Sequence, residues 1–225
     1  GRQAAGRVVG KLGQFAGVLN AGWLDTSDAD IPGFALSQAA RDEAIAGGAD
    51  PADFARGTLP NSAVENKSLS GGLSWVGDGA FLGGAVRRAE NRYGIVAEEE
   101  AFIDMEQTRY DLRGGIDFDG PIKSLRASGS KVDYEHTEFE GPGEPGTRFT
   151  NDGWEGRVEL GHAPIGDLEG SIGVQASDRD FAAGRGPSLR GSSRLGSRRA
   201  LASTGVGIVG IGQHTGQRNQ QRQPS

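Results

Sequence analysis

Two groups of side chains in this sequence have the residue types that bind divalent cations. Glu98, Glu99 and Glu100 are three consecutive carboxylates, and His136 lies two residues before Glu138. Carboxylate oxygens and imidazole nitrogens are ligands for metals such as zinc. A solvated acidic loop is the favoured interpretation of residues 98–100. Capture of a divalent metal by the two groups together is the alternative.

Charged residues alternate with apolar or small ones in two other stretches. They are Arg109, Asp111, Arg113, Arg157 and Glu159. Successive side chains of a strand point to opposite faces, so each set is expected on the polar face of its strand. Ion pairing between neighbouring strands explains them. Direct contact with a substrate that passes along this face is the alternative.

The sequence has no constellation typical of an enzyme. The three histidines, His136, His162 and His214, lie in unrelated contexts and outside any nucleophile motif. Residues 205–210 match the pattern GxGxxG, but no acidic residue follows at the spacing that dinucleotide binding requires. We therefore predict a protein without catalytic activity and without a cofactor of its own.

Long alternating strands are the elements expected to position these residues. The stretch TRYDLRGGIDFDGPIKSLRASGSKV, residues 108–132, predicts two strands joined by a tight turn at 119–121. Similar alternation marks five further strands, at about 13–25, 68–75, 81–93, 154–160 and 168–176. The turns are expected to be compact at 77–79, 119–121 and 164–167, and looser at 25–60, 97–101 and 141–146. The long segment at 25–60 is expected to contain local helices, with Ser37 as an N-cap.

Composition favours a membrane barrel over a soluble core. Hydrophobic residues make up 35% of the chain and 39 of the 225 residues are glycine, which leaves few bulky side chains for a closed interior. A barrel wall needs apolar residues on one face only. The predicted fold is therefore all-β, an antiparallel up-and-down meander of about seven strands that forms part of a transmembrane β-barrel. Trp75, Tyr110 and Trp154 are candidates for the interfacial aromatic girdles.

The chain is expected to divide near residue 183. Residues 1–183 contain all 30 acidic residues, whereas residues 184–225 are rich in Arg, Gly and Ser and contain seven of the 24 basic residues. We expect this C-terminal tail to be disordered. A shifted reading frame or a truncation is the favoured explanation, and a genuine basic tail for anionic lipid or nucleic acid is the alternative.

Several ordered phrases carry a resemblance to a known family. The stretches SWVGDGAFLGGAVRRAENRYGI, FIDMEQTRYDLRG and GTRFTNDGWEGRVELGHAPIGDLEGSIGVQASDRDF, with DTSDADIPGF before them, resemble the barrel of TonB-dependent outer-membrane receptors. The resemblance covers about residues 7–183. The phrase FIDMEQTRYDLRG is similar to that of the zinc-uptake branch.

The resemblance implies a fragment of a plugged outer-membrane barrel. The parent would import a scarce metal, a metal chelate or another small nutrient, with outer-membrane lipid around it and the TonB energy-coupling complex as the partner of the complete receptor. It implies residence in the bacterial outer membrane. No nucleic-acid partner is expected. The alternative, from a different class, is a soluble or surface-exposed β-sheet binding module without transport activity.

Overall fold

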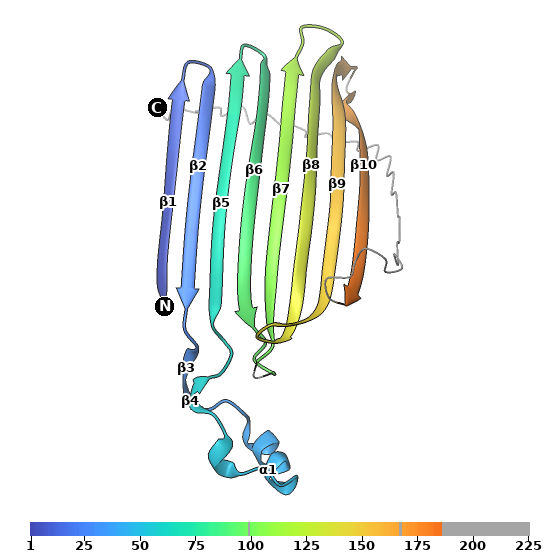
Figure 1. The fold of residues 1–225 in the computed structure, drawn as a ribbon. Helices are drawn as coiled ribbons and strands as arrows, with labels where there is room; N and C mark the ends of the chain where they lie inside the picture. Colours follow the sequence, from blue (N-terminus) through green and yellow to red (C-terminus); the bar gives the residue numbers. More distant parts are fainter. Residues whose placement is uncertain (99, 167, 186–225) are drawn as a thin grey trace, which may run out of the picture.

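The computed structural model describes residues 1–98, 100–166 and 168–185. Its main element is an eight-stranded antiparallel sheet in the order β1-β2-β5-β6-β7-β8-β9-β10 (Figure 1). The strands are β1 (Arg2–Leu12), β2 (Phe15–Thr26), β5 (Val64–Gly77), β6 (Ala80–Gly94), β7 (Phe102–Asp117), β8 (Ile122–Gly141), β9 (Glu144–Ile165) and β10 (Leu168–Arg185). A second, two-stranded sheet pairs β3 (Ala29–Phe34) with β4 (Arg56–Leu59).

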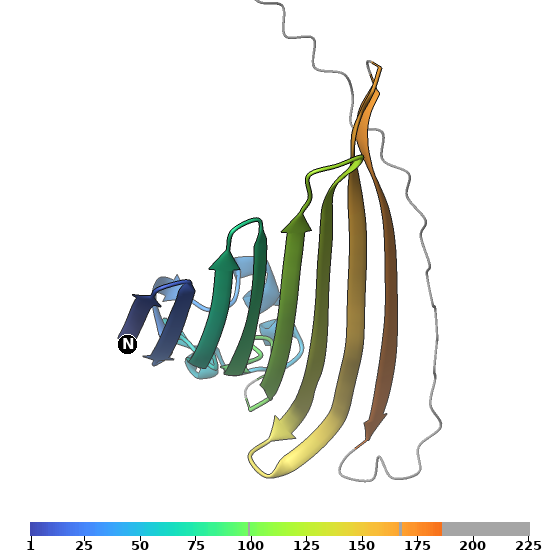
Figure 2. The same ribbon diagram turned by 90° about the horizontal axis from the view of Figure 1, so that it is seen from above.

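The main sheet is a meander, because each strand after the insertion between β2 and β5 pairs with the strand that precedes it. The predicted antiparallel all-β fold is confirmed. The sheet is a single open layer with β1 at one edge and β10 at the other (Figure 2). Each edge presents backbone groups that a further strand can pair with.

The sheet differs from the expected arrangement at two places. It has eight strands and not seven, because residues 2–12 form β1 and turn at Gly13, whose φ of 59° suits glycine. A loose loop was expected at 141–146, but the structure has a tight hairpin there. Strand β8 continues to Gly141, and β9 begins at Glu144. Charged stretches such as 133–140, DYEHTEFE, have weak apolar alternation, so their strand character depends on pairing across the hairpin.

The insertion at 27–63 projects beyond the end of β2 and β5 that lies opposite the compact turns (Figure 1). As predicted, it contains local helices. Ser37 caps α1 (Gln38–Ala46), and its Oγ accepts a hydrogen bond from the Ala40 N–H at 3.2 Å. Asp50 caps the 3₁₀ turn Pro51–Asp53 in the same way, at 2.9 Å from the Ala52 N–H.

Asn61 joins this insertion to the loop between β6 and β7. Its Nδ2 donates toward the carbonyl oxygens of Ile95, Glu98 and Ala101 at 3.0, 2.7 and 2.6 Å. Asn61 has a φ of 56°, a conformation that asparagine tolerates better than most residues. We call these contacts the Asn61 latch, and they fix the relative position of two loops that are distant in sequence.

The register places most of the bulky apolar side chains of the sheet on one face, the apolar face. They form a continuous band near the compact turns, here called the apolar band: Val8, Leu12, Phe15, Leu19, Trp23, Leu69, Leu73, Trp75, Leu82, Val86, Tyr110, Leu112, Ile116, Leu125, Trp154, Val158, Leu160, Ile172 and Val174. The opposite, polar face has mainly Ser, Gly, Ala and Arg at the same level. This separation follows directly from the period-two alternation of each strand.

The band is not covered by protein in the part of the chain that the structure describes. Among all the described residues, Ala101 is the one apolar residue that is buried, at 2% exposure. Leu73, which belongs to the band, is 62% exposed. Soluble monomers rarely expose a contiguous apolar surface that crosses a whole sheet. The apolar face therefore requires another apolar phase or a partner against it.

The expected C-terminal tail begins at 184, but β10 continues to Arg185. The remainder of that tail, 186–225, lies outside the described residues.

Candidate functional site

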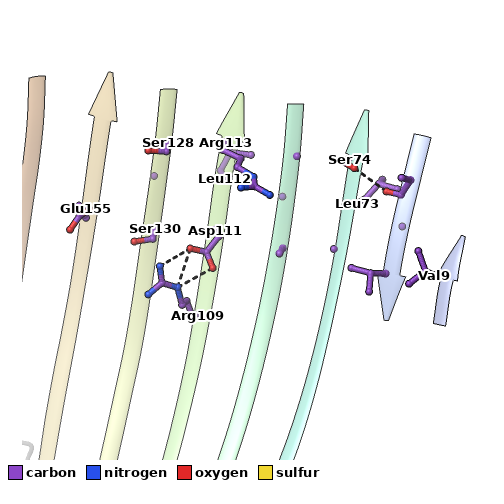
Figure 3. A pocket seen from close by; sticks show the side chains of 18 residues that line it. Val9, Leu73, Ser74, Arg109, Asp111, Leu112, Arg113, Ser128, Ser130 and Glu155 are labelled. Atoms are coloured by element: carbon purple, nitrogen blue, oxygen red, sulfur yellow. Dashed lines mark hydrogen bonds and ion pairs between the residues drawn. The ribbon is translucent and has the colours of Figure 1, made fainter. Parts of the chain in front are cut away.

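The largest group of predicted polar-face residues surrounds a hollow of about 550 Å³ on the polar face (Figure 3). Its floor is made of small residues from β2, β5 and β6, namely Ala16, Gly72, Ser74, Gly83 and Ala85. Its charged side is made by Arg109, Asp111 and Arg113 of β7, with Ser128, Ser130 and Glu155 from β8 and β9. Val9 and Val18 also line the hollow, and the small residues between them and the charged side leave space for a solute.

Arg109 and Asp111 form an ion pair along β7. Arg109 Nε lies 3.0 Å from both carboxylate oxygens of Asp111, and its Nη2 lies 2.8 Å from Oδ1. The hydrogen bond and the charge of Asp111 hold the guanidinium in one orientation toward the hollow. Both side chains are about half exposed, at 48% and 45%, so water screens the pair.

The remaining predicted residues divide into paired and unpaired groups. Arg157 Nη2 lies 2.5 Å from Glu159 Oε2 along β9, so these two residues neutralise each other. Arg113 has no ion pair among the described residues, and neither has Glu155. Of the five predicted residues, Arg113 is therefore the one whose charge is available to a solute in the hollow.

Replacement of Asp111 with asparagine is expected to lower the free energy of unfolding by less than about 1 kcal/mol, because the pair is screened. The measurement is urea unfolding of the chain in detergent micelles at low and high salt. Asp133→Asn is the matched control, because Asp133 pairs with Lys131 at the same spacing along β8, at 2.8 Å. A loss above about 2 kcal/mol for Asp111→Asn alone would show that Asp111 supports more than Arg109.

The predicted metal ligands are distributed over two elements. Glu98 and Glu100 lie in the loop between β6 and β7, where the Glu98 N–H donates to the Ile95 carbonyl at 2.9 Å. His136 and Glu138 lie within β8, and Glu99 lies outside the described residues. Across residues 1–98, 100–166 and 168–185, no three His, Cys, Asp or Glu side chains gather closely enough to hold a metal ion.

A ladder of four rings on the polar face was not predicted. It crosses β8, β9 and β10 in the order Tyr134, His136, Phe149 and Phe181. The ring centroids of His136 and Phe149 are 4.6 Å apart and stacked at 18°, and Tyr134 meets His136 edge-on at 5.5 Å. Phe149 and Phe181 are 6.2 Å apart. We call these four residues the ring ladder.

A signal for the ring ladder is present in the sequence. On β8 the apolar residues occupy odd positions at Leu125 and Ala127, and then even positions at Val132 and Tyr134. The register places the two sets on opposite faces, so the large side chains change face partway along the strand. Phe149 and Phe181 make the same change on β9 and β10.

Beyond the end of the apolar band, the apolar face carries charged side chains. This charged belt consists of Glu65, Lys67, Arg88, Glu90, Glu106, Lys131, Asp133, Glu135 and Arg148. Glu90 and Glu106 are directly opposite each other. Arg88 forms an ion pair with each of them, at 2.9 Å to Glu90 and 2.8 Å to Glu106. The belt therefore marks the level at which the apolar face becomes suited to water.

No protein-family model matches the chain. Within the described residues, no helix combines the length and the apolar character that crossing a membrane requires.

Proposed function

We propose that this chain forms part of the wall of an outer-membrane TonB-dependent receptor. The apolar face contacts lipid hydrocarbon, and the polar face lines a water-filled lumen through which a metal, a metal chelate or another small nutrient passes. The observation that carries this proposal is the restriction of the apolar band to one face and to one end of the strands. Lipid on one side and water on the other produces this distribution.

The dimensions of the band support the proposal. From Phe15 to Trp23 the apolar face of β2 spans nine residues, within the roughly 9–11 residues of a tilted strand that crosses a bilayer. Several strands are much longer, with 20 residues in β8 and 22 in β9. Their excess length lies beyond the charged belt, where the strands would extend from the membrane into water.

The polar face has the properties of a lumen wall. Its hollow has a small-residue floor and a charged side, and three ion pairs on this face join Arg109 to Asp111, Arg126 to Asp117 and Arg157 to Glu159. Lumen residues of outer-membrane barrels tune what passes. Arg113 and the Arg109–Asp111 pair are the residues that we assign to contact with the passing solute. In the complete receptor, further strands close the barrel at β1 and β10, and the TonB complex supplies the energy.

The three tryptophans provide a direct test, because Trp23, Trp75 and Trp154 all belong to the apolar face. The chain is refolded into phosphatidylcholine vesicles with ordinary or brominated acyl chains. We expect brominated lipid to quench the tryptophan fluorescence and aqueous iodide to have little effect. As a control, Ser130→Trp on the polar face, with the three native tryptophans replaced by phenylalanine, should respond to iodide.

Quenching by iodide alone would contradict the proposal. If the chain is also monomeric and rich in β-structure in plain buffer, the soluble β-sheet binding module is the correct function class.

A further inference from the structure

A second hollow, of about 620 Å³, adjoins the ring ladder on the polar face. Gln107, Asn151, Gly153, Arg179 and Phe181 line it, so it lies between β7 and β10 and includes the last ring of the ladder. Gly153 is directly opposite Arg179 in the register and has no side chain of its own in the hollow. Its volume lies in the range of small-molecule sites.

A cationic side chain, Arg179, and an aromatic ring, Phe181, both line this hollow. Arg179 and Phe181 lie two residues apart on β10, so both point to the polar face at a spacing of about 7 Å. Arg179 is exposed and has no ion pair in the part of the chain that the structure describes. Phe181 is 45% exposed, and the stacked rings of Phe149 and His136 support it from behind.

We propose that this hollow binds a small aromatic carboxylate. The ligand ring stacks on Phe181 at the end of the ring ladder, and the ligand carboxylate binds the Arg179 guanidinium in a bidentate manner. The Asn151 Oδ1 atom is buried without a hydrogen-bond partner, next to Phe181 in the register, and it can accept from a ligand hydroxyl after a side-chain rotation. This inference rests on the proposed function only in that the polar face must be open to water.

The chemistry of the hollow favours this ligand class over two others. A purely apolar ligand would leave Arg179 unpaired, and a hydrated inorganic anion would make no use of the ring ladder. Arg109 also lines the hollow, but Asp111 already neutralises it. Glu155, which is opposite Ser177 and therefore diagonal to Arg179 in the register, and Asp178 also line the hollow, so ligands with a second negative charge are disfavoured.

The probe is 4-fluorobenzoate, whose fluorine resonance reports binding to the full chain refolded in bicelles. Arg179→Gln and Phe181→Leu are each expected to weaken binding roughly tenfold or more, from the loss of a charge-assisted bond and of ring stacking. Arg88→Gln and Phe102→Leu are the matched controls. Both lie on the apolar face, where Arg88 belongs to the charged belt and Phe102 stacks on Phe139 at 4.5 Å, and both should leave binding unchanged.

Two comparison ligands separate the contributions. Fluorinated cyclohexanecarboxylate retains the charge without the aromatic ring, and 4-fluorobenzyl alcohol retains the ring without the charge, so each should bind at least roughly tenfold more weakly. Equal binding of either ligand, or unchanged binding by Arg179→Gln, would overturn the proposal. If the chain does not bind 4-fluorobenzoate but brominated lipid quenches its tryptophan fluorescence, the ligand site is overturned and the barrel assignment stands. If the chain shows neither binding of the probe nor quenching by brominated lipid, the barrel assignment is rejected as well.

Discussion

Replacement of Leu73 with arginine is expected to weaken insertion of the chain into a bilayer by about 2–4 kcal/mol, the cost of a basic side chain near the bilayer midplane. Leu73 is 62% exposed in the middle of the apolar band, between Gly17 of β2 and Gly84 of β6. These glycines have no side chains to cover it. The measurement is the fraction inserted into vesicles as a function of urea concentration.

The neighbouring residue supplies a matched control. Ser74 lies at the same depth on the polar face and lines the hollow at its small-residue floor. Ser74→Arg should insert almost as well as the unsubstituted chain, because in the proposed barrel a side chain on the polar face stays in water. Equal effects of the two substitutions would show that the face of the sheet does not matter, which would contradict a lipid contact on the apolar face.

Replacement of Gly94 with alanine is expected to lower the free energy of unfolding by roughly 2–4 kcal/mol, through overpacking and through loss of hydrogen bonds in the Asn61 latch. A Cβ on Gly94 would overlap both the side-chain and the backbone oxygen of Asn61. Asn61 cannot move away without releasing the carbonyl groups of Ile95, Glu98 and Ala101. Urea unfolding measures the total effect.

Hydrogen exchange shows where the effect arises. The Ile95 N–H donates to the Ala101 carbonyl at 2.8 Å, and its exchange should accelerate in Gly94→Ala. Gly10→Ala is the control, because no atom outside its immediate chain neighbours lies within 4 Å of a Cβ at Gly10. If Gly94→Ala leaves both the stability and the Ile95 exchange unchanged, the latch does not hold the two loops together.

Local signals in the sequence predicted much of the fold. Ser37 acts as a cap because its side-chain oxygen can reach a backbone N–H three residues later, wherever the rest of the chain lies. The compact turn at 77–79 was predicted from its Gly-Asp-Gly sequence, and Gly79 has a φ of 72°. Such features depend on residues that are adjacent in sequence.

Strands with weak alternation were not predicted from the sequence. In β1 the apolar face carries Ala4, Gly6 and Gly10 beside its larger residues, so the periodic signal is small. Pairing with β2 along eleven residue pairs, from Arg2 with Asp25 to Leu12 with Phe15, makes it a strand. The predicted metal ligands illustrate the same limit, because proximity of Glu98 or Glu100 to His136 depends on the path of the loop and not on spacing.

The sequence by itself determined that most strands have one apolar and one polar face, because the face of each residue follows from its position in a period of two. Only the tertiary structure decided which side chains meet across strands. Tyr134, His136, Phe149 and Phe181 are separated by up to 47 residues and form one ladder because the hairpin registers align them. A shift of one residue in any register would move its partners to the other face, so cross-strand sites depend on pairing over the whole sheet.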